Sequence, residues 1–337
     1  MQDRKIYLDR LKVMAIICVI IIHVTGVWWN ISVEANTWLI LTVMQSIAKV
    51  GVPIFLMVTG ALLLDEKKEI GFQKIYKQYL PRIILFFLFW AVLYKLFYYW
   101  EHPMQGNLIV SIIKDIIRAD VQYHLWYIYA LIPIYMVIPV IRKWIAGLTK
   151  KEIEYVLILW FLYEIFDYFV VNTQTFSLYK NVDYMKIGYL GYVILGYYLD
   201  RFADTWNRKI IYTLGIIGIV AAMILVVYFS RQAGCVQDSY FYYLTPGVIL
   251  WSACVFVWEK ERTVKQESKV VKFISRSTLG IYGGHLSVLI VLNHFGIMVS
   301  EHMLLASVFL ITILVLSISI GFCRIVEKIP ILNRFVI

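Results

Sequence analysis

Lys12 and His23 lie in the first strongly apolar stretch of the chain, Leu11–Trp29, with ten residues between them. On an α-helix this spacing is almost three turns, so both side chains lie on one face, roughly 16 Å apart along the axis. Asp9 falls on the same stripe. Imidazole titrates near neutrality and, when neutral, accepts protons as a general base. The spacing therefore predicts a cationic mouth at Lys12 and a catalytic base deeper along the same face at His23.

Two further histidines lie at the ends or in the interior of other apolar stretches. His285 is preceded by Gly283 and Gly284, whose small size allows close helix approach, and its expected depth is comparable to that of His23. His124 and Trp126 open another stretch, at a level where aromatic residues are common in membrane proteins. Two histidines at one depth favour a polar centre, although each alone could be a hydrogen-bonded residue between helices.

Lys49 is the most deeply placed lysine of the second apolar stretch, and Glu164 and Asp167 in the fifth stretch are its candidate partners. A lysine at that depth requires an anionic partner, a polar cavity or a substrate phosphate or carboxylate. We assign Lys49 and Glu164 to substrate binding, with a structural ion pair as the alternative.

Arg82 and Lys77 lie at one end of the third stretch, where guanidinium geometry suits phosphate binding. For these residues and for Lys12 the alternative is a side chain that extends to the lipid headgroups.

The elements that position these residues are membrane-spanning helices. Of the 337 residues, 61% are hydrophobic and only 16% are charged, which is far more apolar than a soluble domain. Windows of about 20 apolar residues predict an all-α, polytopic membrane protein with about ten transmembrane helices. The predicted helices are Leu11–Trp29, Trp38–Leu64, Leu80–Trp100, Leu125–Ile141, Ile153–Asn172, Tyr184–Leu199, Ile210–Phe229, Phe241–Trp258, Phe273–Val291 and His302–Phe322.

Basic residues are concentrated in every second segment between these helices, as the positive-inside rule requires. The rich segments lie near residues 4–12, 67–77, 142–151, 201–209, 260–272 and 324–334, whereas the intervening ones hold few lysines or arginines. This alternation predicts an even number of spans in the cytoplasmic membrane, with both termini in the cytoplasm.

The net charge of +10 follows from this topology and from contact with anionic lipids, so we expect no nucleic-acid partner. Four cysteines, Cys18, Cys235, Cys254 and Cys323, show no metal-like spacing, and we expect no metal. The first apolar stretch is too long for a cleavable signal and has no clean cleavage site. No segment between helices is large enough for a second domain, so residues 1–337 are predicted to form one membrane domain.

These residues occur in segments that together resemble the membrane-bound acyltransferase 3 family. The matching segments are IYLDRLKVMAIICVIIIHVTG, which contains Lys12 and His23, VPIFLMVTGALLL, the segment at Arg82, YHLWYIYALIPIYMVIPVI and ISRSTLGIYGGHLSVLI. They extend from near Ile6 to about Glu327. Within the family the pattern is most similar to the enterobacterial common antigen O-acetyltransferase type. In one departure, Tyr79 stands where many members have an arginine three residues before Arg82.

The resemblance implies O-acetyl transfer from acetyl-CoA to a hydroxyl of a cell-surface or lipid-linked glycan that contains N-acetylglucosamine. Lys12, Arg82 and Lys77 would then hold the CoA phosphates, and His23 would act as general base or carry the acetyl group as an acyl-imidazole. Asp9 would orient a basic neighbour. His285 or Lys49 would stabilise the tetrahedral oxyanion, and His124 and Trp126 would lie on the acceptor side.

Three other interpretations remain open at this stage. Intramembrane Lys, Glu and His residues could line the path of a lipid-linked-sugar transporter or flippase, although the chain lacks paired halves with broken helices. Succinyl or another acyl group could replace acetyl, with an exopolysaccharide as acceptor. A membrane portion fused to a soluble catalytic domain is a third arrangement, which the end of the chain at Ile337 disfavours. The oligomeric state cannot be predicted.

Overall fold

The computed structural model describes residues 5–102, 106–173, 188–262 and 268–329, and the regular structure in these ranges is helical. The first half contains α1 (Ile6–Val24), η1 (Thr25–Trp29), α2 (Asn36–Ala48), α3 (Gly51–Leu63), α4 (Phe72–Lys74), η2 (Ile75–Tyr79), α5 (Leu80–Glu101), α6 (Leu108–Ile117), η3 (Tyr123–Leu125) and α7 (Trp126–Ala146). The second half contains α8 (Lys150–Thr173), α9 (Gly188–Phe202), η5 (Ala203–Thr205), α10 (Arg208–Ala233), η6 (Asp238–Phe241), α11 (Pro246–Glu261), α12 (Lys269–His294) and α13 (Leu304–Glu327). The predicted all-α class is confirmed.

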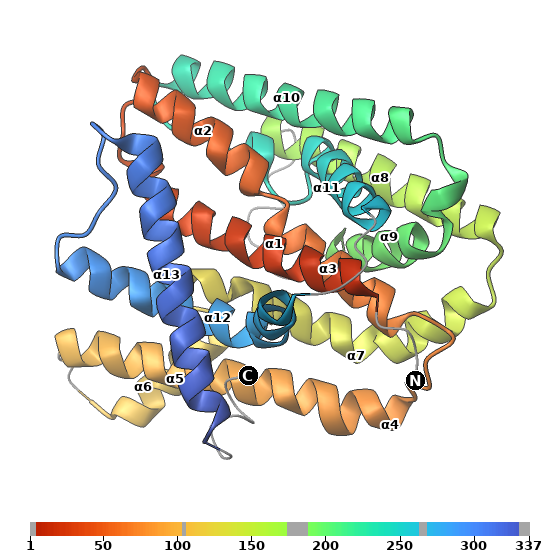
Figure 1. The fold of residues 1–337 in the computed structure, drawn as a ribbon, viewed down its shortest axis with the longest axis horizontal. Helices are drawn as coiled ribbons and strands as arrows, with labels where there is room; N and C mark the ends of the chain where they lie inside the picture. The colour runs from red at the N-terminus through yellow and green to blue at the C-terminus, as the bar shows by residue number, and fades with distance from the viewer. Residues whose placement is uncertain (1–4, 103–105, 174–187, 263–267, 330–337) are drawn as a thin grey trace.

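Helix α1 is the central element of the bundle. It contacts α2, α3, α11, α12 and α13, and it lies between α10 and α5 in the view of Figure 1. Leu11, Ile16 and Ile20 on this helix are fully buried. The helix that carries Lys12 and His23 is therefore surrounded by protein along much of its length.

Seven helical segments of the described residues are long and apolar enough to cross a membrane. They coincide with seven of the predicted spans, and α8, α9 and α12 occupy the positions of the other three. The first residues of the span predicted from Tyr184 lie outside the described ranges. Large apolar side chains such as Ile217, Ile224 and Phe309 are exposed on the outside of the bundle, as expected where helices face lipid. The chain is thus a multi-pass membrane protein, but this count does not reach the expected ten.

The second predicted span is not one continuous helix. It divides into α2 and α3, which are separated by Lys49 and Val50. Pro53 in the first turn of α3 lacks a backbone N–H and so removes one hydrogen bond across the junction. The break places Lys49 between two helices, where its side chain leaves the regular helical surface.

A similar local change precedes α5. Residues Ile75–Tyr79 form a π-helical turn that ends two residues before Pro81, whose ring and missing N–H disturb the preceding turn. The widened turn carries Tyr79, and Arg82 follows it in the first turn of α5.

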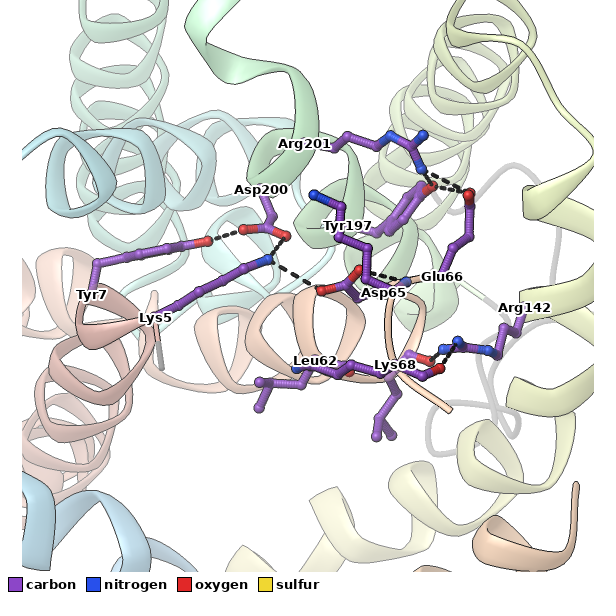
Figure 2. Close-up of polar contacts among 12 residues, drawn as sticks. Lys5, Tyr7, Leu62, Asp65, Glu66, Lys68, Arg142, Tyr197, Asp200 and Arg201 are labelled. Atoms are coloured by element: carbon purple, nitrogen blue, oxygen red, sulfur yellow. Dashed lines mark hydrogen bonds and ion pairs between the residues drawn. The ribbon is translucent and has the colours of Figure 1, made fainter. Parts of the chain in front are cut away.

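The segments rich in lysine and arginine meet at one end of the bundle, as their alternation along the sequence predicts. Figure 2 shows Lys5, before α1, in contact with Asp65 after α3 and Asp200 at the end of α9. Arg142 of α7 donates to the carbonyl oxygens of Leu63 and Lys68. Further contacts at the same end join Arg10 to Glu259 and Lys260 to Asp204.

Helices α3 and α9 cross very closely. A Cβ atom added at Gly60 would lie 1.8 Å from the carbonyl oxygen of Val193, and one added at Gly196 would lie 2.0 Å from that of Met57. Small residues at membrane helix crossings allow this approach of two backbones. Because α3 begins at the break beside Lys49, the crossing fixes the position of that break.

We predict that Gly60→Ala lowers the stability of the purified protein by about 1–3 kcal/mol, since α3 and α9 must separate to admit the methyl group. Thermal unfolding in detergent measures the effect. Gly321→Ala in α13 is the matched control, because nothing lies within 4 Å of its added Cβ. An equal melting temperature for the two variants would contradict the prediction.

Candidate active site

His23, His124 and His285 form one cluster near the centre of the helix bundle. Their ring centroids are separated by 5.0 Å between His23 and His285, 5.3 Å between His124 and His285, and 6.2 Å between His23 and His124. The three residues come from α1, η3 and α12. His124 and His285 are buried, whereas His23 is half-buried. The fold therefore brings together His23 and His285, which were expected at one depth. It adds His124, which was expected on the acceptor side.

Hydrogen bonds between elements hold this cluster together. The hydroxyl of Tyr282 on α12 donates to the carbonyl oxygen of His124, and that of Tyr94 on α5 donates to Gly283 at 2.8 Å. Gly283 also packs on the indole of Trp90, where an added Cβ would lie 2.2 Å from Nε1. The glycine pair before His285 thus leaves room for the indole of Trp90, a residue of α5, against α12.

The surroundings of His285 determine which of its nitrogens carries the proton. Its Nδ1 lies 2.7 Å from the carbonyl oxygen of Tyr282 and 3.2 Å from that of Ile281, so this nitrogen is assigned as the donor. Nε2 is then an acceptor in the neutral ring, and it is buried without a hydrogen-bond partner within the described residues. In this state His285 offers a lone pair, so a neutral His285 does not supply the hydrogen bond to an oxyanion that the sequence suggested.

Lys49 lies against aromatic rings rather than against Glu164. Its Nζ is 4.7 Å from the ring centroid of Phe241 and 5.0 Å from that of Tyr243, distances typical of cation–π contacts. It also interacts electrostatically with Asp238 and with His23. Trp126 packs on Tyr243 with a centroid separation of 5.3 Å, so it belongs to the same region.

Glu164 occupies a separate place on α8. It is 1% exposed, and its Oε1 accepts a hydrogen bond from Trp160 Nε1 at 3.0 Å. The expected ion pair with Lys49 is not formed, because α8 directs this carboxylate toward α9 near Gly188. This position does not support the substrate-binding role that the sequence suggested for Glu164.

A cavity of about 870 Å³, called here the inner cavity, extends from the basic end of the bundle toward the histidines. The cations on its wall are Lys12, Lys68, Lys74, Arg82 and Arg276. At the other end its lining includes Tyr127 and Tyr282. The Tyr282 ring is 5.5 Å from that of His124 and 5.9 Å from that of His285. A cationic mouth and the histidine cluster are thus joined by one cavity and one intervening tyrosine.

A second cavity of about 820 Å³, called here the side cavity, adjoins the first. Its lining includes Asp9, Asp65, Asp200, Tyr197 and Arg201. Lys12, Leu62, Lys68 and Arg276 line both cavities and so form their common boundary.

Two residues predicted for the site lie elsewhere. Asp9 accepts a hydrogen bond from Ser275 on α12 and is fourteen residues before His23, roughly 21 Å along the helix axis. At this distance Asp9 does not touch a group that reacts at His23, and its hydrogen bond fixes α1 against α12. Asp9 lines the side cavity together with Lys12, so its role of orienting a basic neighbour stays a prediction. Lys77 is exposed on the π-helical turn and lines neither cavity.

Four residues of the site were not identified from the sequence. Lys68 and Arg276 line the cavities, Tyr282 lies between the inner cavity and the histidines, and Tyr123 has its ring 5.3 Å from His23 while 62% of the residue is exposed. Lys68 was visible as a basic residue of a predicted inner segment, and Arg276 as a basic residue near the inner end of the predicted span Phe273–Val291. Only the packing of helices distinguishes them from the other basic residues there.

At the basic end of the bundle, the carboxylate of Asp65 lies close to the ammonium groups of Lys5 and Lys68. Burial alone would raise the pKa of Asp65, but the backbone N–H of Lys67 and the ammonium of Lys5 lower it below its ordinary value. Burial lowers the pKa of Lys68, and the nearby carboxylate of Asp65 opposes this change. Asp65 therefore stays ionised and keeps the loop attached to Lys5.

The model of a known family, described as an acyltransferase domain of the acyltransferase 3 type, matches residues 5–324. The chain belongs to the acyltransferase 3 family. The match covers nearly the whole length and includes every residue of the histidine cluster. No curated protein and no solved structure matches the chain. The protein is therefore a membrane acyltransferase, and the family match does not distinguish the enterobacterial common antigen type from other members.

The histidine cluster of this acyltransferase does not have the arrangement of a metal site. Within the described ranges, no group of three His, Cys, Asp or Glu side chains is placed to hold a metal ion.

We predict that Tyr282→Phe destabilises this acyltransferase by about 1–3 kcal/mol, because the buried carbonyl of His124 loses its donor. Turnover should fall as well, since η3 is then free to shift His124 away from His285. Thermal unfolding and acyl transfer are measured together, with Tyr228→Phe at an exposed position as control. Unchanged stability in Tyr282→Phe would show that the hydrogen bond does not hold the cluster.

Proposed function

We propose that this protein transfers an acetyl group from cytoplasmic acetyl-CoA to a hydroxyl of a cell-surface or lipid-linked glycan, with an N-acetylglucosamine-containing polysaccharide as acceptor. The observation that carries the proposal is the inner cavity, which leads from a cationic mouth to Tyr282 beside the histidine cluster. A long donor with an anionic end and a reactive tip fits this distribution of charge. The family supplies the acyl-transfer chemistry.

The basic end of the bundle is taken as the cytoplasmic side. Lysines and arginines are retained on the cytoplasmic face of membrane proteins, and here their segments converge at one end. Both termini would then be cytoplasmic in a protein of the cell membrane. This orientation presents the mouth of the inner cavity to the compartment that contains acyl-CoA.

The donor would be held by charge at the mouth and by shape beyond it. Lys12 and Arg82 both line the inner cavity and suit phosphate groups, since lysine acts as a point charge and arginine as a planar fork. Lys12 lies roughly 16 Å from His23 along α1, a distance that an extended thioester arm has to cover. Tyr127 and Tyr282 line the inner cavity on the side of the histidine cluster, where the thioester would lie.

The chemistry follows from a neutral imidazole at His23. His23 removes the proton of the acceptor hydroxyl, whose oxygen attacks the thioester carbonyl carbon. The tetrahedral oxyanion collapses, the carbon–sulfur bond breaks, and the departing CoA sulfur receives the proton from His23. The cation of Lys49, which interacts electrostatically with His23, favours the negative charge of the intermediate. In the alternative route, a nitrogen of neutral His23 attacks the thioester carbonyl carbon, the carbon–sulfur bond breaks, and CoA leaves with the imidazole proton. The acceptor hydroxyl then attacks the acyl-imidazole, the carbon–nitrogen bond breaks, and the hydroxyl proton passes to the departing imidazole.

The acceptor would reach His23 from the other side of the membrane. Tyr123 is exposed and its ring lies against His23, while Trp126 and Tyr243 extend the aromatic surface toward Lys49. Aromatic faces suit the apolar faces of sugar rings, and a lysine suits polar or anionic substituents. His124 is buried, so in this proposal it contributes to the histidine cluster and does not contact the glycan directly.

We predict that His23→Ala abolishes both hydrolysis of labelled acetyl-CoA and transfer to glycan acceptors, because the general base and acyl carrier are the same ring. Donor binding should remain, since the cations of the mouth are unchanged. Purified protein in nanodiscs allows turnover and CoA binding to be measured on one sample. Wild-type turnover in the variant would remove His23 from the mechanism.

A second prediction separates the mouth from the chemistry. Lys12→Ala should weaken acetyl-CoA binding about tenfold, the scale of one lost charge-assisted contact, with a smaller effect on the chemical step. Lys77→Ala is the matched control, because this exposed lysine lines neither cavity. Equal affinities of the Lys12 and Lys77 variants for acetyl-CoA would contradict the role of Lys12.

A further inference from the structure

The side cavity has no role in the reaction so far, although it is nearly as large as the inner cavity. Both volumes, about 820 and 870 Å³, are within the usual range for small-molecule sites of roughly 300–1,000 Å³. The two spaces meet at Lys12, Leu62, Lys68 and Arg276, which contribute to both linings. One ligand could therefore occupy both cavities across this boundary.

The far wall of the side cavity carries paired charges. Lys5 contacts Asp200 at 2.6 Å and Asp65 at 3.4 Å, while Arg201 contacts Glu66 at 2.8 Å. The hydroxyl of Tyr197 joins the second pair by donating to Glu66 at 2.9 Å and accepting from Arg201 at 2.7 Å, as Figure 2 shows. These pairs neutralise one another and leave a wall with both donors and acceptors. Such a wall suits a polar group with mixed hydrogen-bonding edges.

The boundary between the cavities differs from this wall. Neither Lys68 nor Arg276 forms an ion pair with any residue in the described ranges, and Lys68 donates only to the carbonyl of Leu62, at 3.3 Å. Both side chains have the polar ends needed to hold an anion, and arginine binds phosphate oxygens in pairs. The strongest attraction for an anion is therefore at the boundary between the two cavities.

We propose that the side cavity binds the nucleotide end of the acyl-CoA donor, with the diphosphate at Lys12, Lys68 and Arg276 on the boundary and the acylated pantetheine arm in the inner cavity. This inference rests on the proposed function, because it divides that donor into parts. An acyl-CoA has a purine nucleotide with a phosphate on its ribose, an anionic diphosphate link and a long neutral arm, in that order, and Lys5, Lys67 and Arg201 on the wall of the side cavity are cations for the ribose phosphate. The structure offers a mixed polar cavity, a cationic boundary and a cavity that leads to Tyr282, in the same order.

The reverse orientation would not deliver the acyl group. Among the residues that line the side cavity, none packs against the ring of His23, His124 or His285, and Asp9 on its wall is roughly 21 Å from His23 along α1. The inner cavity, in contrast, includes Tyr282, which contacts two of the three histidines. A thioester in the side cavity would be remote from the general base. Reaction therefore requires the acyl end of the donor in the inner cavity and the nucleotide end in the side cavity.

The first test compares two donors in one variant. Arg276→Ala should raise the KM for acetyl-CoA about tenfold and leave the KM for acetyl-pantetheine, which lacks the nucleotide and diphosphate, unchanged. Lys77→Ala is the matched control and should change neither value, because Lys77 lines neither cavity. An equal change for both donors in Arg276→Ala would overturn the assignment of the boundary. Absence of acetyl transfer from either donor to glycan acceptors by the wild type would instead overturn the proposed function.

The second test locates the purine directly and needs no turnover. Wild-type protein is irradiated with an 8-azidoadenosine analogue of CoA, and the labelled peptides are identified by mass spectrometry. We expect label at residues 62–68 or 197–201, which border the side cavity, and loss of label in excess unmodified CoA. Label confined to the walls of the inner cavity, or label that CoA does not displace, would overturn the inference.

Discussion

The structure depends on the need to solvate ionisable side chains inside an apolar bundle. His23 is on the central helix, and an imidazole at that depth is stable only among other polar or aromatic groups. His124, His285, Tyr123 and Lys49 supply these groups from three other parts of the chain. Each of these parts ends or breaks near the cluster, or approaches it through small residues. The interruptions in regular structure are thus concentrated where the chemistry is proposed.

Close helix contact makes this arrangement rigid. Gly60 and Gly196 let α3 and α9 cross with their backbones almost touching, and Gly283 lets α12 pack on Trp90. In a lipid environment, apolar side chains gain little by leaving lipid for protein, so association relies on such packing and on hydrogen bonds. The bond from Tyr282 to His124 is one example, since it connects α12 to the turn that carries the third histidine. The geometry of the imidazoles is therefore a product of helix crossings far from any substrate.

The basic end of the bundle has two electrostatic parts. In one part, lysines and arginines bind carboxylates or backbone carbonyl oxygens and hold the loop between α3 and α4 against α1, α7 and α9. In the other, Lys68 and Arg276 face cavities without an ion pair in the described residues. Pairing fixes the wall, and the unpaired cations give the cavities their attraction for anions. The preference for basic residues on one side of the membrane therefore also supplies the cations of the proposed donor site.

Composition and periodicity determined much of this protein by themselves. Twenty-residue apolar stretches predict helices because a bilayer leaves no other way to satisfy the backbone, and the positions of the predicted spans agree with the helices. The spacing of Lys12 and His23 also fixed their common face and separation, since both lie on one helix. Tertiary structure alone decided which distant residues join them. It brought His124 into the cluster and placed Glu164 and Lys77 away from it. It also put Lys49 against aromatic rings instead of against Glu164. Contacts between helices depend on crossing angles and glycine positions, which local spacing does not reveal.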